Sequence, residues 1–254
     1  MRIEVAGHTH VGMKRNHNED NLLVMPEERL FCVADGMGGH SSGEIASKIA
    51  VDEISEFFKM TARDVEATWP YKMDKSKSYD ENRLATAIKL ANSRIYERAA
   101  AEQKFKGMGT TVATVHFVAA NAFVGHVGDS RVYWFRQGQL KQVTEDHSLL
   151  NDYLKAKKLT PEEIDAFPHK NVIVRALGMK DTVQVDLNRF ETQDGDVFLI
   201  CSDGLSGMVP DASIQEVLTK VQDLDTAGKQ LIDLANANGG SDNVTCVLAR
   251  WIAN

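Results

Sequence analysis

The sequence of this 254-residue chain predicts an α/β fold of largely antiparallel sheets sandwiched by helices. Three observations predict it: many short runs with strand composition, few long segments of helical period, and very short connections between successive runs. Nine runs rich in Val, Ile, Phe and Thr have the length of strands: 3–9, 21–25, 30–34, 110–118, 122–127, 131–136, 183–188, 197–202 and 244–250. The three runs between 110 and 136 are joined by about three residues each, which favours antiparallel hairpins over parallel crossovers.

Three segments have the 3.6-residue period of amphipathic helices. The first begins at Ser41 and Glu44, which have capping-box spacing, and its apolar face comprises Ala46, Ile49, Ala50, Ile54 and Phe57. The second covers about 82–99, with Leu84, Ala87, Ile88, Ala91 and Ile95 on one stripe. The third lies near the end of the chain and carries Ala227, Leu231, Leu234 and Ala235. These helices would cover the faces of the sheets.

Two stretches are expected at the surface. Residues 60–81 are polar and contain Trp69, Tyr71 and Tyr79, which could form a partner surface or a small local core. Residues 144–176 have short helical pieces, two prolines and many charges. No linker, low-complexity tract or repeat divides the sequence, so we expect one domain over 1–254.

Composition excludes several classes of protein. Hydrophobic residues make up 43% of the chain, enough for a large core. A net charge of −7 makes nucleic acid an improbable general partner, because phosphate backbones are bound mainly by basic side chains. Cys32, Cys201 and Cys246 are widely spaced in apolar runs, as buried free thiols of a reducing cytosol are. Since no apolar run approaches membrane-spanning length, we expect a cytoplasmic protein without a membrane partner.

Acidic residues recur at the ends of the apolar runs, next to glycine or within tight turns. The segments are 15–21 (RNHNEDN), 33–40 (VADGMGGH), 128–131 (GDSR), 201–204 (CSDG) and 240–244 (GSDNV). One such segment is usually an ordinary turn whose side chain bonds its own backbone. Repetition changes the interpretation, because carboxylates gathered at one rim of a sheet repel one another unless a cation lies among them. Oxygen ligands of this kind suit magnesium or manganese rather than zinc.

The sequence resembles the metal-dependent Ser/Thr protein phosphatases of the type 2C family, particularly the bacterial members. The matching segments, in the family's order, are RxxNED at 15–20, ADGMGGH at 34–40, GMGTT at 107–111, HVGDSR at 126–131, CSDGL at 201–205 and SDNVT at 241–245. The resemblance implies two mainly antiparallel sheets packed as a sandwich with helices outside both, in α-β-β-α layers. It also implies that residues 144–176 are a flap subdomain beside the active site.

The same resemblance implies a phosphatase that hydrolyses phosphoserine or phosphothreonine by attack of a hydroxide bridging two divalent ions, Mn²⁺ or Mg²⁺. Asp35 would bridge the ions, the Gly36 carbonyl would bind one of them, and Asp203 with Asp242 would complete the other. Glu19 and Asp20 would hold metal-bound waters, and Asp20 would orient the attacking one. Asp129, with Asp203, resembles the ligands of a third, weaker ion in bacterial members.

Two further residues are candidates for the chemistry. Arg15 would clamp the phosphate, because a guanidinium donates two parallel hydrogen bonds and keeps its charge; its plainer alternative is an ion pair with Glu19 or Asp20. Animal members commonly place His directly after Asp-Gly as the acid for the leaving group, whereas this chain has Met37 there. His40 and metal-bound water are both candidates for that proton.

The motifs also admit other interpretations. The run 36–41 lacks the third glycine of a dinucleotide-binding turn, and Asp35 would repel a pyrophosphate. His8 and His10 could share a strand face as metal ligands, although an exposed face gives the same alternation. Functional alternatives are a catalytically inactive phosphoprotein-binding member and a two-metal phosphodiesterase acting on small substrates. By resemblance the partners are phosphoproteins and an opposing Ser/Thr kinase, and the chain would be a monomer.

Overall fold

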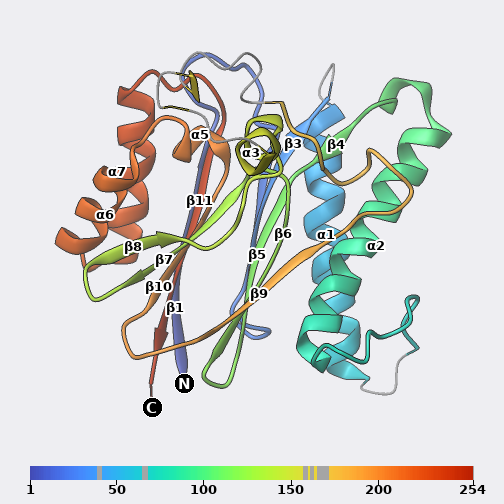
Figure 1. Cartoon of the computed structure of the whole chain (residues 1–254), viewed down its shortest axis with the longest axis horizontal. Helices are drawn as coiled ribbons and strands as arrows, with labels where there is room; N and C mark the ends of the chain where they lie inside the picture. The colour runs from blue at the N-terminus through green and yellow to red at the C-terminus, as the bar shows by residue number, and fades with distance from the viewer. Residues whose placement is uncertain (39–41, 65–67, 157–159, 161–162, 165–171, 254) are drawn as a thin grey trace.

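The computed structural model describes residues 1–38, 42–64, 68–156, 160, 163–164 and 172–253. Two antiparallel sheets pack face to face, with helices on both outer sides, which confirms the predicted α-β-β-α sandwich (Figure 1). The first sheet has the strand order β1-β11-β10-β7-β8, and the second has the order β2-β3-β5-β6-β9 with β4 paired to β3. No helix in these described ranges is long and apolar enough to cross a bilayer.

The strands follow the predicted runs closely. Those of the first sheet are β1 Arg2–His10, β7 Arg131–Arg136, β8 Gln139–Gln142, β10 Val197–Cys201 and β11 Val244–Ile252. Those of the second are β2 Asp20–Met25, β3 Leu30–Met37, β4 Gly109–Thr110, β5 Val112–Val118, β6 Asn121–Val127 and β9 Asp186–Glu191. Every pair between them is antiparallel.

Three strand predictions need correction. The run 110–118 divides into β4 and β5 at Thr111, whose amide donates to the Asp35 carbonyl of β3 (2.9 Å) between the two stretches of regular pairing with that strand. The strand expected at 183–188 covers 186–191, since its pairing with β6 begins only at Asp186 opposite His126. Strand β8 was not predicted, because it is only four residues long and alternates without aliphatic β-branched residues.

The helices lie in two groups, one outside each sheet (Figure 1). Helices α1 Ser42–Arg63 and α2 Tyr79–Ala101 cover the second sheet, and α6 Asp211–Lys220 and α7 Leu224–Ala237 cover the first. The remaining ones are η1 Gln103–Phe105, α3 Leu149–Ala156 and α5 Asp203–Ser206. Helix α6 was not predicted, since only Ile214, Val217 and Leu218 of its residues are buried apolar side chains. Ser41, the expected cap of α1, lies outside the described residues.

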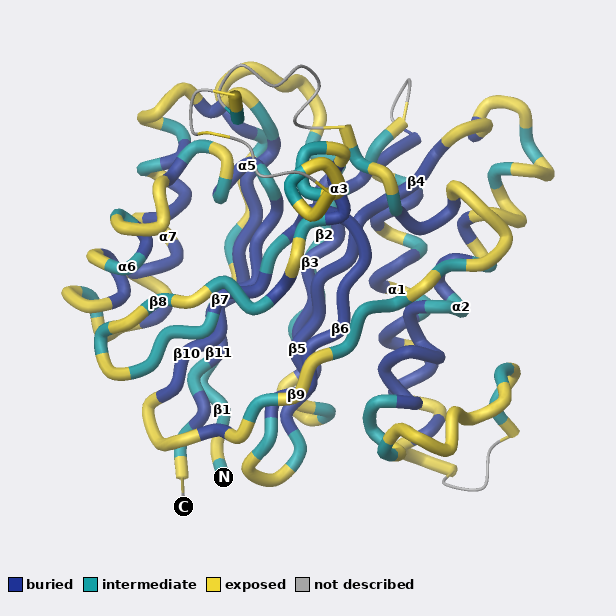
Figure 2. The backbone as a smooth tube through the Cα atoms, in the orientation of Figure 1, coloured by how far each residue is buried: buried dark blue, intermediate teal, exposed yellow. Residues whose placement is uncertain are grey.

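Buried residues form three layers, one between the sheets and one under each pair of helices (Figure 2). The layer between the sheets includes Phe31, Phe117 and Phe198, whose rings meet edge to face. Cys32, Cys201 and Cys246 are buried and free, as expected. These layers leave the strand ends as the places where polar side chains gather, which is where the sequence places the acidic segments.

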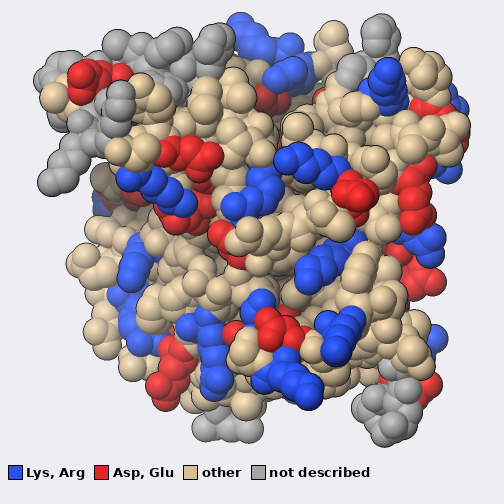
Figure 3. Space-filling view, turned by 45° about the vertical axis from the view of Figure 1, so that its right-hand side comes forward, with Lys and Arg blue, Asp and Glu red and all other residues tan. Residues whose placement is uncertain are grey.

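The surface segment predicted at 60–81 is shorter in the structure, because residues 60–63 are the end of α1 and residues 79–81 are the start of α2. Its Trp69 packs against Phe57 (ring centroids 5.5 Å) and Tyr79 (5.1 Å), and Tyr71 donates a hydrogen bond to the Lys89 carbonyl. These contacts favour the local core over a partner surface. Acidic and basic side chains are interspersed over the face drawn in Figure 3, without the continuous basic stripe that nucleic acid would need.

Candidate active site

Five acidic residues come together at one end of the sandwich, opposite the two chain termini (Figure 1). Asp20 begins β2 and lies directly opposite Asp35, near the end of β3, in the strand register. Asp203 begins α5 immediately after β10, and Asp242 precedes β11. Asp129 lies in the turn between β6 and β7. Because β10 pairs with β11 and β2 with β3, the two sheets bring these separate segments to one rim.

Gly36 is required by how tightly the chain packs beside Asp35. A Cβ atom at this position would lie 2.1 Å from the Gly43 carbonyl oxygen and 2.6 Å from that of Glu19. The Gly36 amide donates to the Glu19 carbonyl (3.1 Å), which ties the 15–20 segment to the end of β3. A side chain here would push α1 away from the acidic cluster.

Asp20 is a buried carboxylate with half of its hydrogen-bonding capacity unused. Its exposed fraction is 5%, and Oδ2 accepts a hydrogen bond from Ser202 Oγ (2.8 Å). Oδ1 has no partner among the described residues. Burial, together with the charges of Asp203 and Asp242, raises the pKa of Asp20 to about 7. A buried oxygen without a donor is a place where a cation or a water bound to one would be stabilised.

Asp35 and Asp203 form a pair of neighbouring carboxyl groups, as the sequence pattern implied. Burial raises the pKa of Asp35 well above its ordinary value, and the charges of Asp20 and Asp203 raise it further. Burial and then Asp242 raise the pKa of Asp203, which a hydrogen bond with the Asp35 carboxyl partly lowers. Two carboxyl groups that close share a proton in the absence of a cation.

Asp129 is another buried carboxylate with an unpaired oxygen, and it lies near Asp203. Its exposed fraction is 8%, and its Oδ1 is likewise unpaired within the described part of the chain. Burial, Asp203 and Asp146 raise the pKa of Asp129 to about 7. With Asp203 and Asp242 it lines a cavity of about 550 Å³, whose other walls include Leu150 and Ile164 of the 144–176 segment. The expected flap therefore borders the acidic cluster.

These observations fit a group of hard divalent cations. The side-chain donors are all carboxylates, two of them have unpaired buried oxygens, and four have pKa values raised by the charge of another member. Such a site is destabilised when every carboxylate is ionised and is stabilised by positive charge. Oxygen donors in this number are those of Mg²⁺ and Mn²⁺.

Arg15 and Glu19 lie at the edge of the cluster. The Arg15 guanidinium donates to Asp242 Oδ2 (2.7 Å) rather than to Glu19 or Asp20, and this bond raises the pKa of Arg15. Its side chain is 53% exposed, so it can leave Asp242 for a ligand. Arg15, Glu19 and the exposed Lys14 line a second cavity of about 500 Å³. The alternative prediction for Arg15, an ion pair with Glu19 or Asp20, was therefore wrong about the partner, which is Asp242.

Other candidates are placed differently. His40 lies outside the described residues. His8 pairs with Asp225 (3.1 Å), and His10 Nδ1 accepts from the Gly12 amide (2.9 Å). His8 contacts Asp225 of α7, whereas His10 contacts the adjoining turn and Asn236 of α7, so the two rings have separate partners rather than a shared metal site.

Three residues inside the matched motifs have structural roles that sequence reasoning missed. Asn243 accepts from the Glu19 amide and donates to the carbonyls of Val11 and His17, which fixes the 11–19 loop against β11. Thr111 Oγ1 accepts from the Asp35 amide (3.1 Å) and pairs with Ser130 Oγ (2.6 Å). Ser202 bonds both Asp20 and the Thr245 amide. Their position beside the acidic residues was the available signal.

Comparisons with known proteins identify the family of the chain. A family model described as protein phosphatase 2C matches residues 6–252. The serine/threonine phosphatase stp of Listeria innocua is 36% identical over 245 residues, covering 93% of this chain and 91% of that protein. Protein phosphatase PhpP of Streptococcus pneumoniae is 34% identical and covers 97% of this chain and 96% of its own length.

Solved structures show the same fold. The serine/threonine phosphatase PstP/Ppp of Mycobacterium tuberculosis superimposes with a TM-score of 0.86 at 33% identity, over 100% of both chains. The catalytic domain of PstP in complex with two manganese ions gives a TM-score of 0.82 at 33% identity, over 99% of both chains. The likeness therefore extends over essentially the whole chain.

Proposed function

The chain belongs to the protein phosphatase 2C family and is a metal-dependent Ser/Thr protein phosphatase, and from that premise we propose which residues carry the reaction. Asp35 and the Gly36 carbonyl hold two divalent ions, Mn²⁺ or Mg²⁺, together with Asp203 and Asp242. Asp129 and Asp203 hold a third, weaker ion. The observation that carries this assignment is the gathering of buried and half-buried carboxylates at one rim of the sandwich, where they raise one another's pKa.

Two ions bound here supply an activated water near neutral pH and neutralise the phosphoryl charge. The protein residues position the substrate and the water. Asp20 Oδ2 is fixed by Ser202, so its free Oδ1 is placed to orient the attacking water and to accept its proton. Glu19 orients further waters from the edge of the site. His40 or a water donates the proton that the leaving alkoxide needs.

Arg15 clamps the phosphate. Its guanidinium already donates to one carboxylate oxygen of Asp242, and a phosphoryl group presents the same pair of oxygen acceptors with more charge. The Asp242 bond holds the guanidinium at the edge of the acidic cluster, from where its exposed side chain can turn to a substrate phosphoryl group.

The flap 144–176 contacts the phosphoprotein. Its described residues border the acidic cavity through Leu150 and Ile164, and it exposes Leu149, Tyr153, Val172 and Val174. Exposed apolar side chains beside an active site favour contact with a protein substrate. Exchanging the flap for that of a relative should change the preference among phosphopeptides while activity on a small aryl phosphate is kept; equal loss on both would contradict the role.

The wider setting follows from the reaction. The opponent of the enzyme is a Ser/Thr kinase that forms its substrates, and the chain works as one domain and as a monomer. Its three buried free thiols are compatible with a cytoplasmic location. The inactive, binding-only alternative is disfavoured because every acidic residue of the assigned site is present.

The function is tested by hydrolysis of a phosphothreonine peptide and of an aryl phosphate with Mn²⁺, with Mg²⁺ and with chelator. We expect turnover of both substrates with metal and none with chelator. A folded, metal-loaded protein that is inactive on both would instead support the binding-only member. Turnover that is indifferent to chelator would exclude the metal site.

A further inference from the structure

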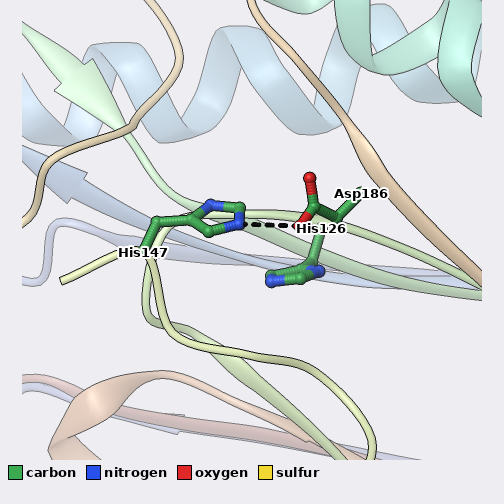
Figure 4. A group of neighbouring side chains, drawn as sticks. All are labelled: His126, His147 and Asp186. Carbon is green, nitrogen blue, oxygen red and sulfur yellow. Dashed lines mark hydrogen bonds and ion pairs between the residues drawn. The ribbon is translucent and has the colours of Figure 1, made fainter. Parts of the chain in front are cut away.

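Two histidines and an aspartate meet at the base of the flap, where residues 145–147 begin that segment (Figure 4). They are His126 at the end of β6, His147 in the flap and Asp186 at the start of β9, and their nitrogen and oxygen atoms lie within 4.8 Å of one another. His126 and His147 are stacked with ring centroids 4.6 Å apart. All three lie outside the site assigned above, although His147 contacts the turn that carries Asp129.

The hydrogen bonds of His147 identify a proton-bearing network rather than a cation site. The Gly128 amide donates to His147 Nδ1 (3.0 Å), so in the neutral ring the proton is on Nε2, which donates to Asp186 Oδ2 (3.2 Å). A metal ion on Nε2 would displace that proton. It would also meet the Arg175 guanidinium, whose Nη1 lies 3.0 Å from Nε2 and donates to Asp186 Oδ1 (2.7 Å).

His147 is joined to the Gly128–Asp129 turn by a reciprocal pair of bonds. Its own amide donates to the Gly128 carbonyl (2.9 Å), while its ring accepts from the Gly128 amide. Gly128 has a φ of +111°, and a Cβ atom there would lie 2.6 Å from Thr111 Cβ and Cγ2. The turn is therefore held between Thr111 on one side and the His147 ring on the other.

The neighbouring ion pair supports the same connection. Arg131, two residues after Asp129, donates to both oxygens of Asp146, the residue before His147 (2.7–3.2 Å). His126 donates to the carbonyl of Glu145 (2.8 Å). The base of the flap, 145–147, is thereby bonded to β6 and to the turn 128–131 through side chains, while Asp186 anchors His147 to β9.

We propose that His147 is a positioning residue for the phosphatase reaction: by accepting the Gly128 amide on Nδ1, it fixes the Gly128–Asp129 turn from which the Asp129 carboxylate would hold the third ion. The inference rests on the proposed function in one respect, the role of Asp129 as a ligand. Asp186 and Arg175 act one step further out, since they fix the ring orientation. Outer groups of this kind typically change metal affinity or activity 10- to 100-fold when they are lost.

Two amide substitutions separate the two bonds of His147. In His147→Asn the amide oxygen takes the place of Nδ1 and can accept from Gly128, but the bond to Asp186 is lost. In His147→Gln the amide takes the place of Nε2 and can reach Asp186, but the Gly128 amide loses its acceptor. We expect His147→Asn to retain aryl phosphate turnover within about fivefold, since the bond to the Gly128 amide is kept and only the bond to Asp186 is lost. His147→Gln should lose about 10- to 100-fold in turnover and bind its weakest Mn²⁺ ion about 10- to 100-fold less tightly in titration calorimetry, so that it needs more Mn²⁺ for half-maximal rate.

A double-mutant cycle shows whether His147 acts through Asp129. In an Asp129→Asn chain, His147→Gln should cause less than about a twofold further loss. His116→Gln is the matched control: His116 is also a buried histidine, 3% exposed, but it lies on β5 and contacts Arg29. It should lower the unfolding midpoint without changing the Mn²⁺ requirement.

The outcomes distinguish the positioning role of His147 from the role of Asp129 as a metal ligand. Equal losses from His147→Gln in the wild-type and Asp129→Asn chains would overturn the positioning role and leave Asp129 as a ligand. A variant His147→Asn as impaired as His147→Gln would overturn it as well, because the Gly128 bond would then be irrelevant. Wild-type activity and Mn²⁺ requirement in Asp129→Asn alone would instead contradict the proposed third ion.

Discussion

Strand β10 has an aspartate at each end, and the two are stabilised in opposite ways. Asp196, before the strand, is 1% exposed and accepts hydrogen bonds from Arg136 Nε (2.8 Å) and Nη2 (2.6 Å) and from the Gln193 amide (2.8 Å). Asp203, after the strand, faces Asp35 and Asp242, and its pKa is raised. The chain supplies a matched cation at one end of the strand and gathers further carboxylates at the other.

This difference shows that the acidic cluster is incomplete without a cation from solution. The guanidinium groups that lower the pKa of Asp203 are those of Arg15 and Arg131. Each is bonded to another carboxylate, Arg15 to Asp242 and Arg131 to Asp146. A fold that can bury Asp196 with an arginine could do the same for Asp203, so the missing partner indicates function rather than a limit of packing.

The largest expected effect separates the two ends of β10. Asp203→Asn should lower Mn²⁺-dependent phosphopeptide hydrolysis about 10³-fold, because a metal ligand is lost, and should raise the metal-free unfolding free energy because repulsion is relieved. Asp196→Asn should lower the unfolding free energy by about 2 kcal/mol, since Arg136 is partly exposed, and leave the turnover of folded enzyme unchanged. Urea unfolding with chelator and peptide hydrolysis with Mn²⁺ measure both.

Similar changes in stability and activity in the two variants would contradict the contrast between Asp196 and Asp203. If Asp203→Asn destabilised the metal-free protein as Asp196→Asn does, its carboxylate would be held by the chain itself. The acidic cluster would then be an ordinary ion network.

An intermediate effect is expected for the phosphate clamp. Arg15→Ala should lower kcat/KM for the phosphopeptide about 10- to 100-fold, the loss of one charge-assisted bidentate contact, and Arg15→Lys should restore part of it. Lys14→Ala is the matched control, since Lys14 is exposed in the same cavity but has no assigned role. Equal loss in Lys14→Ala and Arg15→Ala would indicate a general charge effect instead of a clamp.

The smallest expected effect is a pH dependence of the metal-free protein. The pKa values of Asp20 and Asp129 are raised to about 7 from 3.8, so between about pH 4 and 7 the folded state binds protons that the unfolded state releases. The stability of the metal-free chain should therefore fall as the pH rises through this range. The thermal midpoint in chelator measures it, and Mn²⁺ should raise the midpoint most at the upper end. A midpoint that is flat in Asp20→Asn/Asp129→Asn and sloping in wild type would assign the slope to these groups.

The sequence predicted the architecture and the acidic cluster because both depend on local patterns. Apolar runs that end in Asp-Gly or follow Asp-Asn mark strand ends, and the antiparallel sheets carry Asp35, Asp203 and Asp242 to one rim. Contacts between distant segments were beyond the pattern. Arg15 pairs with Asp242, 227 positions away, and Asn243 fixes the 11–19 loop across a similar separation. The pairing of β9 begins three residues later than its apolar run suggested, because the partner strand β6 sets the register.

The most direct measurement is the number of Mn²⁺ ions bound per chain, by titration calorimetry and metal analysis, in the wild-type protein and in Asp35→Asn, together with phosphothreonine-peptide turnover of the same samples. The account predicts two tightly bound ions in wild type, loss of at least one in Asp35→Asn, and turnover that disappears with it. Two ions and normal turnover in Asp35→Asn would contradict the claim that these carboxylates form the catalytic metal site.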